Sequence, residues 1–416
     1  MQEYSSITYS ILQANTKQKV EQGKIILLNL DRIMIHDGTG PVVASTLEKF
    51  GITNLDAIDR TILVFDHYFP AKTSREAFLQ KTARLFAEKY DIPLYQGKGI
   101  SHHILSEKCL IRPGTVLVGG DSHTCTSGAF GIFASGYGAT DIAGCIKTGK
   151  LWLEVPEVIK VRLVGKPDKN TNAYDIALKI VGIIGTSGAL SKVIEFFGPA
   201  LEYLEMQERM KISNFAVETG ALSGIFDIDE VCEKWCNERN IKFNKSLMNR
   251  GKYNTSWDFE IDVSSTEKLV AKPSKPDLVV SENEIKKIKV DQVFIGSCSA
   301  GFFKDIKLAA EKIKGKKAAD NVRLLIGPAT EKVLNDLLEA GYIKTLMDSG
   351  AVILPVGCGS CLGNIGALAD GEVAVATQNR NFIGRVGSKK AKIYLASAET
   401  AIEAAISGTI GEENGH

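Results

Sequence analysis

The chain lacks the features that would direct it to a membrane or to a nucleic acid. Its 50 lysines and arginines nearly balance its 49 aspartates and glutamates, so a net charge of +1 provides no overall attraction for RNA, DNA or anionic lipid. No apolar run approaches the ~20 residues of a membrane span, and the first residues lack a basic segment followed by an apolar core. We therefore expect a cytoplasmic protein that binds neither nucleic acid nor membrane.

Regular cysteine spacing, internal repeats and low-complexity tracts are also absent. The eight cysteines are scattered over 416 residues, which excludes the disulfide framework of a small secreted domain and indicates free thiols in a reducing compartment. Cys232 and Cys236 lie four residues apart in a helical pattern, and we interpret them as packing residues on one helix face. The length exceeds what a single core supports, so two or three globular domains are predicted.

Alternating strand and helix patterns predict an α/β fold. Strands are predicted at 24–35, 61–65, 115–118 and 158–163, and helices at 42–51, 74–90 and 173–182. From residue 289 onward strand and helix patterns alternate, which indicates a parallel sheet. Residues 251–290 are polar and contain prolines, so they are predicted to be a linker. The three α/β domains are predicted to cover 1–156, 157–285 and 286–416.

Three cysteines follow predicted strands in the last third of the chain. Cys358 and Cys361 lie in a glycine-rich turn after the apolar run 352–354, and Cys298 follows the run 293–297. Structural zinc normally takes four ligands and a thioredoxin-type redox pair takes two, so three converging sulfurs suit a metal site with one open position. The alternative is that these thiols pack as small hydrophobic side chains.

Histidines and carboxylates gather in the turns after predicted strands of the amino-terminal half. Five of the six histidines lie in or beside these turns, including His67, His102 and His123. Functional side chains in α/β proteins gather at the carboxyl ends of strands, so this grouping favours a site over scattered surface histidines. Asp66 and His67 form a candidate acid/base pair, although a pair of this kind can also cap a turn.

Two other motifs place charge in specific surroundings. Glu195 lies in the apolar run VIEFFG, where an unpaired carboxylate is costly, so it is either a partnered site residue or a glutamate at a strand edge. Arg380 and Arg385 lie five residues apart around a glycine, and their planar guanidinium groups can bind carboxylates bidentately. The arginine pair indicates a local site for an acidic ligand.

Motifs over nearly the whole length resemble the aconitase superfamily, and within it the 3-isopropylmalate dehydratase large subunits. The resemblance rests on these segments, in family order: FDHYFP, GKGISHH, GGDSHTCTSGAFG, ATDIAG, TGKLWLEVPE, VIEFFG, DQVFIGSC, GCGSCLG and NRNFIGR. It implies three α/β domains with parallel or mixed sheets around a central cluster cleft, without the swivel domain of longer members.

The resemblance also implies a cofactor and a reaction class. In this superfamily three cysteines hold a 4Fe-4S cluster, and the iron without a protein ligand binds the substrate. Cys298, Cys358 and Cys361 match those cysteines. Thiolates are the usual cluster ligands, and the open corner acts as a Lewis acid. The implied activity is that of a hydro-lyase, which reversibly removes and adds water on a malate-type hydroxy acid.

Further residues match superfamily positions around the substrate. His67, backed by Asp66, matches the group that protonates the departing hydroxyl. The residues that match hydrogen-bonding groups of the surrounding shell are His102, Asp121, His123 and Glu195. Arg380 and Arg385 match arginines that bind substrate carboxylate, and Asn379 matches a residue beside the cluster. The superfamily base that takes the carbon-bound proton is a serine on the swivel domain, so we expect a small partner subunit to supply it in a heterodimer.

Departures from the superfamily pattern leave the substrate open. Ala300 and Phe302 replace a usual asparagine and arginine, and His103 replaces a common glutamine. A pocket edge with Phe302 and Phe303 suits a substrate with less charge or more methyl groups. The predicted function is 3-isopropylmalate dehydratase, in leucine biosynthesis, with 2,3-dimethylmalate dehydratase or homoaconitase as alternatives. A cluster-sensing or RNA-binding protein is the non-enzyme alternative, and the near-zero net charge argues against RNA.

Overall fold

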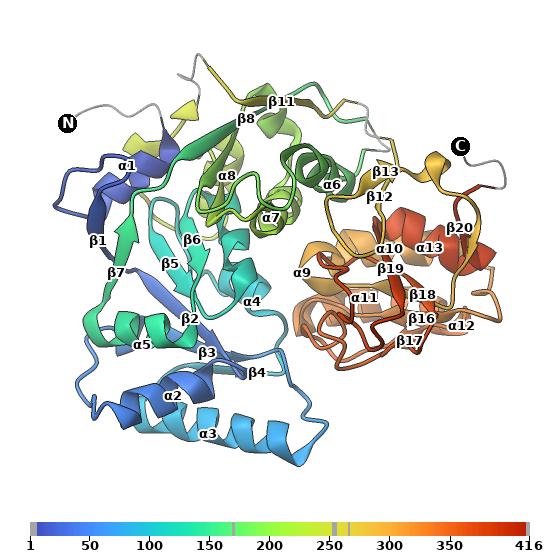
Figure 1. Cartoon of the computed structure of the whole chain (residues 1–416), viewed down its shortest axis with the longest axis horizontal. Helices are drawn as coiled ribbons and strands as arrows, with labels where there is room; N and C mark the ends of the chain where they lie inside the picture. Colours follow the sequence, from blue (N-terminus) through green and yellow to red (C-terminus); the bar gives the residue numbers. More distant parts are fainter. Residues whose placement is uncertain (1–5, 169–170, 252–255, 265–266, 413–416) are drawn as a thin grey trace.

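The computed structural model describes residues 6–168, 171–251, 256–264 and 267–412. Its described strands form sheets of five, four and seven strands and two two-stranded ribbons. In Figure 1 the first two sheets lie on one side of the molecule and the third lies on the other. The α/β architecture predicted from the sequence is confirmed. None of the helices in the described ranges combines the length and the apolar composition needed to cross a bilayer.

The five-stranded sheet has the order β4-β3-β2-β5-β6, and its neighbouring strands are all parallel. The strands are β2 (Arg32–His36), β3 (Thr61–Phe65), β4 (Leu94–Gln96), β5 (Val116–Gly119) and β6 (Phe133–Gly136). Around them lie α1 (Ile7–Ala14), α2 (Gly40–Lys49), α3 (Ser74–Tyr90), α4 (Ser101–Glu107), the 3-10 helix η2 (Ser122–Phe130) and α5 (Ala139–Thr148). β3 and β5 are buried throughout, as expected for central parallel strands.

The prediction of one strand over 24–35 is wrong, because this segment forms two strands in different sheets. β1 (Ile25–Asn29) pairs with β7 (Lys150–Glu154) in an antiparallel ribbon, whereas β2 enters the five-stranded sheet. Exposed and buried residues alternate in β1, but β2 is almost entirely buried. The change from alternation to continuous burial marks the division, which falls at the polar residues Asp31 and Arg32.

The four-stranded sheet is parallel and has the order β10-β9-β8-β11. Its strands are β8 (Val158–Val164), β9 (Val193–Phe197), β10 (Ser223–Phe226) and β11 (Phe259–Asp262). Its helices are α6 (Ala173–Ile184), α7 (Met206–Phe215) and α8 (Glu230–Asn237), with the 3-10 helix η4 (Ala216–Thr219) after α7. Cys232 and Cys236 are buried in the core on α8, which confirms that they are packing residues.

The seven-stranded sheet has the order β13-β12-β19-β18-β15-β16-β17. Its strands are β12 (Leu269–Ala271), β13 (Val279–Ser281), β15 (Gln292–Ile295), β16 (Arg323–Ile326), β17 (Val352–Ile353), β18 (Val373–Ala376) and β19 (Lys392–Ala396). The helices are α9 (Ser297–Ala300), α10 (Phe303–Ile313), α11 (Glu331–Glu339), α12 (Tyr342–Asp348) and α13 (Ala398–Ser407). β15 to β19 are parallel to one another, as the alternating pattern predicted.

The prediction of a linker over 251–290 is wrong for the described residues in that range. β11 completes the second sheet, whereas β12 and β13 add two antiparallel strands to the third sheet. A further short strand, β14 (Ile288–Lys289), pairs with β20 (Thr409–Ile410). Strand pairing therefore joins 269–281 to the third sheet, although the sequence analysis placed this segment in the second domain. Strands of two to four residues are too short to show a hydrophobic period.

Asp175 in the first turn of α6 carries a buried carboxylate between the second and third sheets. Its side chain is 3% exposed, and its Oδ1 accepts a hydrogen bond of 3.2 Å from the Leu269 N–H of β12. Burial, assisted by Glu399 and Glu282, raises the pKa of Asp175 from 3.8 to about 7. Because the folded protein then binds this proton more tightly than the unfolded chain, the free energy of unfolding falls as the pH rises from about 4 to about 7.

We expect Asp175→Asn to remove this loss of stability. Between pH 5 and pH 8 the free energy of unfolding of the variant should rise relative to wild type by roughly 2 to 3 kcal/mol. Urea unfolding at several pH values measures the difference, and Asp59→Asn, at a side chain that is 75% exposed, serves as the control. Parallel pH profiles for Asp175→Asn and wild type would contradict the raised pKa.

Candidate functional site

The turns after strands of the first and third sheets meet in one region. Asp66 and His67 follow β3, and they face the turn after β17, where the Cys358 N–H donates to the Asp66 carbonyl oxygen at 2.7 Å. His103 on α4 places its Nε2 3.0 Å from the carbonyl oxygen of Cys298 on α9. The structure therefore brings the predicted histidine and cysteine turns together from distant parts of the chain.

Asp121 lies at the centre of a network of imidazoles and carboxylates. Its Oδ2 is 3.0 Å from His67 Nε2, and its Oδ1 is 3.1 Å from His102 Nε2. Oδ1 also accepts a hydrogen bond of 2.6 Å from the His123 N–H. On its other side, His67 places Nδ1 2.7 Å from Asp66 Oδ1. His67, His102 and His123 thus all contact Asp121, and Asp66 contacts it through His67.

The charges of this network favour a protonated His67. Burial disfavours the imidazolium, but the adjacent carboxylates of Asp66 and Asp121 outweigh burial and raise the pKa of His67 well above its ordinary value. Burial likewise opposes the ionised form of Asp121, but His102 and His67 outweigh it and hold the pKa of this carboxyl well below its ordinary value. A proton on His67 between two carboxylates is in the form needed for a general acid.

His36, at the end of β2, stacks on His67. The sequence analysis counted it among the histidines of these turns but gave it no role of its own. The two ring centroids are 3.8 Å apart and the planes differ by 13°. His36 Nδ1 accepts a hydrogen bond from the Gly38 N–H, and its Nε2 donates to the Gly120 carbonyl, so the ring is held in one neutral tautomer. Burial, and then the charge of His67, lower the pKa of His36 to about 4. A neutral ring therefore supports one face of the charged ring.

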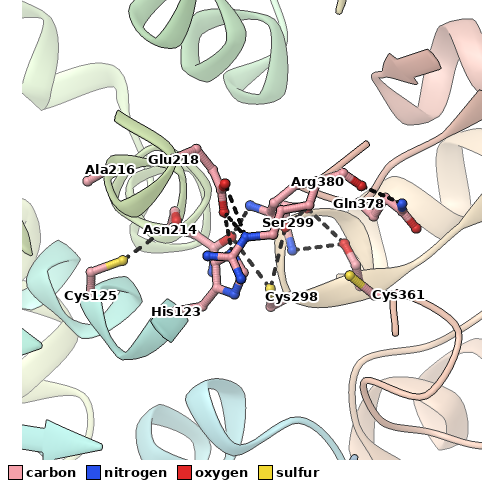
Figure 2. A network of polar contacts seen from close by, with 12 residues as sticks. His123, Cys125, Asn214, Ala216, Glu218, Cys298, Ser299, Cys361, Gln378 and Arg380 are labelled. Atoms are coloured by element: carbon pink, nitrogen blue, oxygen red, sulfur yellow. Dashed lines mark hydrogen bonds and ion pairs between the residues drawn. The ribbon is translucent and has the colours of Figure 1, made fainter. Parts of the chain in front are cut away.

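Glu218 on η4 is a site residue that sequence reasoning missed. Its Oε1 is 2.9 Å from His123 Nε2 and accepts a hydrogen bond of 2.8 Å from Arg380 Nε. Figure 2 shows the carboxylate of Glu218 above the side chains of His123 and Arg380, with dashed lines to them. Burial, and then the charge of Arg380, lower the pKa of His123 despite this carboxylate. Glu218 thus joins the histidine turn of the first sheet to the arginine segment of the third.

The structure does not bring Glu195 into the network around Asp121. Glu195 is buried in β9, where its Oε1 accepts hydrogen bonds from Ser6 Oγ at 2.5 Å and from the Thr8 N–H at 2.7 Å. The carboxylate therefore binds the amino-terminal end of α1, where orphan backbone N–H groups favour an anion. Of the two interpretations left open by the sequence, Glu195 is partnered, but its partners are structural.

The three predicted cysteines are free thiols. The Cys298 thiol lies 3.5 Å from Asn214 Oδ1 and 3.6 Å from Asn379 Oδ1, and Arg385 Nη2 lies 3.6 Å from Cys361 Sγ. Figure 2 shows Cys298 in the centre of the view, near Asn214 and Ser299, and Cys361 to its right. Asn214 is a further buried site residue that the sequence did not reveal.

This sulfur donor set fits a multi-iron cluster. Burial raises the pKa of Cys298 and of Cys358 well above the ordinary value, and the charges of neighbouring cysteines add to the shift. Thiols in such surroundings become thiolates when a bound metal supplies positive charge. Their sulfurs are not among the groups of three or more ligand atoms that lie within 4.8 Å of one another in the described residues, which argues against one metal ion bound directly by all three.

Other groups of the region are available to a ligand. His102 Nδ1 and Arg385 Nε are buried and have no hydrogen-bond partner within the described residues. Phe302 is buried, with its ring centroid 4.5 Å from that of His103, which places it next to the site. Phe303 instead packs against Tyr342 of α12, with ring centroids 6.1 Å apart. Of the two phenylalanines predicted at the pocket edge, the structure brings only Phe302 against a residue of the site turns.

Comparison with known proteins gives similarity over nearly the whole chain. The model of the aconitase family (aconitate hydratase) matches residues 9–283 and 262–408. The chain is 40% identical over 403 residues to the 3-isopropylmalate dehydratase large subunit 1 of Methanopyrus kandleri, covering 96% of each chain. It is 42% identical to the 3-isopropylmalate dehydratase large subunit of Caldicellulosiruptor bescii, covering 95% of this chain and 93% of that protein.

A solved structure shows the same fold. The holo-form of Thermococcus kodakaraensis aconitase X aligns with 91% of this chain and 90% of its own chain, with a TM-score of 0.53 and 12% sequence identity. At this identity the similarity concerns the fold alone.

Proposed function

This chain belongs to the aconitase family of 4Fe-4S hydro-lyases, and from this premise we propose that it is the large subunit of a 3-isopropylmalate dehydratase. The observation that carries the proposal is the carboxylate of Asp121 between His67 and His102, next to the cysteine turns. The names of relatives that are 40% and 42% identical support the choice of substrate.

The residues of this chain divide the work between binding and proton transfer. Cys298, Cys358 and Cys361 hold the cluster, which supplies Lewis acidity toward the substrate hydroxyl when it is bound. His67 donates the proton on its Nε2 to the departing hydroxyl, and Asp66 holds the ring in position through Nδ1. Arg385 binds a substrate carboxylate through the nitrogen that lacks a partner.

Glu218 and Asn379 orient groups of the same site. Glu218 fixes the guanidinium of Arg380 through hydrogen bonds of 2.8 and 3.1 Å to Nε, which leaves its terminal nitrogens for a second substrate carboxylate. Asn379 is fully buried and accepts a hydrogen bond of 3.1 Å from Ser299 Oγ beside the Cys298 thiol. The relatives are named large subunits, which supports a small-subunit partner, and we assign to that partner the base that removes the carbon-bound proton.

A reconstitution assay tests this proposal. The chain, purified without oxygen and loaded with iron and sulfide, is assayed alone and with a small subunit from a similar enzyme system. We expect turnover of 3-isopropylmalate only when both chains are present, with slower turnover of 2,3-dimethylmalate, citramalate and homocitrate. A higher rate with one of the other acids would change the substrate, and full activity of the chain alone would contradict the division between two subunits.

A further inference from the structure

An apolar face lies on the antiparallel ribbon of β1 and β7, outside the candidate site. Exposed and buried residues alternate in both strands, so one face of the ribbon packs on the core and the other faces solvent. The solvent face carries Ile25, Leu27 and Trp152, which are 53%, 47% and 62% exposed. Figure 1 shows the ribbon on the side of the molecule that is turned away from the seven-stranded sheet.

The exposed apolar side chains form a continuous surface. Leu27 and Trp152 are direct partners in the register of the two strands, and side chains directly opposite in an antiparallel pair share a face. Ile25 is the next outward residue along β1. Trp152 also lines a hollow of about 990 Å³ together with Leu190, which is 65% exposed. Soluble monomers rarely expose a large contiguous apolar patch, so this surface indicates a binding partner.

Charges of opposite sign lie at the two ends of this surface. On β7, Lys150 and Glu154 are both exposed and flank Trp152, and their register partners on β1 are Asn29 and Ile25. Within the part of the chain that the structure describes, neither charged side chain has an ion-pair partner. A matching surface therefore has an apolar centre, a negative group opposite Lys150 and a positive group opposite Glu154.

We propose that this ribbon face, made of Ile25, Leu27, Lys150, Trp152 and Glu154, binds the ribbon face of a second copy of the chain. A two-fold axis between the copies that crosses β7 at right angles at Trp152 places the two β7 strands antiparallel over one another. Lys150 then faces the partner's Glu154 at both ends, while Leu27 and Trp152 face their own counterparts. An axis along the strand would instead place like charges together, which disfavours it.

The ribbon face suits a second copy better than it suits the small subunit. A subunit that supplies a base must reach the cysteine and histidine turns, whereas the ribbon lies on another side of the molecule (Figure 1). The dimer is independent of the proposed function, because no residue of the ribbon face lies in the site.

Sedimentation of the full chain at several concentrations tests the dimer. Wild type should dimerise at micromolar concentrations. Lys150→Glu and Glu154→Lys each replace two attractive contacts of the symmetric dimer by two repulsive ones, and Trp152→Glu places a charge at its apolar centre. Each should weaken the dimer by about tenfold or more, which corresponds to ~1.4 kcal/mol or more. Phe78→Glu, at an equally exposed phenylalanine of α3 that is 67% exposed, is the control and should not change the dimer.

Mixing the two charge variants tests whether the ribbon face itself forms the contact. Lys150→Glu and Glu154→Lys should be monomeric alone but should form a dimer with each other, because the two-fold axis then places opposite charges together at both ends. Restored dimerisation supports the proposal. A monomeric wild type at all concentrations, a mixture that stays monomeric although wild type dimerises, or equal dissociation by Phe78→Glu would each overturn it.

Discussion

Replacing His67 by asparagine should lower turnover by about a hundredfold or more, with little change in substrate binding. His67 is the imidazole held between Asp66 and Asp121, at 2.7 and 3.0 Å. Asparagine keeps a polar side chain that can donate a hydrogen bond, but it has no proton to transfer at neutral pH. A hundredfold loss corresponds to about 2.7 kcal/mol in the activation free energy, which is typical of a lost general acid.

The measurement is kcat and KM for 3-isopropylmalate with the complex of both subunits. Iron and sulfide content must be determined on the same sample, so that a loss of cluster is distinguished from a loss of the proton donor. Lys72→Gln, at a side chain that is 46% exposed and five residues further along the same turn, is a matched control that should retain turnover. Wild-type turnover of His67→Asn would exclude the assigned role, and a raised KM with unchanged kcat would make His67 a binding residue.

The motifs with local chemistry were predictable from the sequence. Asp66 and His67 are neighbours in the chain, and Cys358 and Cys361 share a glycine-rich turn. The sequence therefore shows the members of each pair together, and the fold adds only the contact between the two pairs. His102 and Asp121 follow the same rule, since each lies in a polar turn near the end of an apolar run. Such turns gather at one edge of a parallel sheet, which places them in one site.

Residues whose role depends on distant partners were not predictable. Glu195 and Glu218 both lie in largely apolar stretches, and no local pattern tells a site carboxylate from a structural one. Glu195 binds Ser6, which is 189 residues away in sequence, and Glu218 binds Arg380, which is 162 residues away. Only the fold shows that the carboxylate of Glu218, and not that of Glu195, contacts residues of the site. The short strands β12 and β13 were missed for a similar reason, because three residues show no hydrophobic period and only the pairing with a distant sheet defines them as strands.

The second large effect concerns Cys361. Its side chain is buried, and Arg385 Nη2 is 3.6 Å from its sulfur. A serine hydroxyl is smaller, harder and far less acidic than a thiol, so it is a poor ligand for cluster iron. Cys361→Ser should therefore lose the cluster, whereas Cys109→Ser, at an exposed cysteine, should keep it.

The most direct test of the account is the iron and sulfide content of wild type, Cys361→Ser and Cys109→Ser after identical anaerobic reconstitution. We expect about four irons and four sulfides per chain, with brown absorbance, for wild type and Cys109→Ser, and almost none for Cys361→Ser. Urea unfolding of the metal-free proteins checks that all three chains are folded. Full iron and sulfide in a folded Cys361→Ser variant would contradict the assignment of the cluster to Cys298, Cys358 and Cys361.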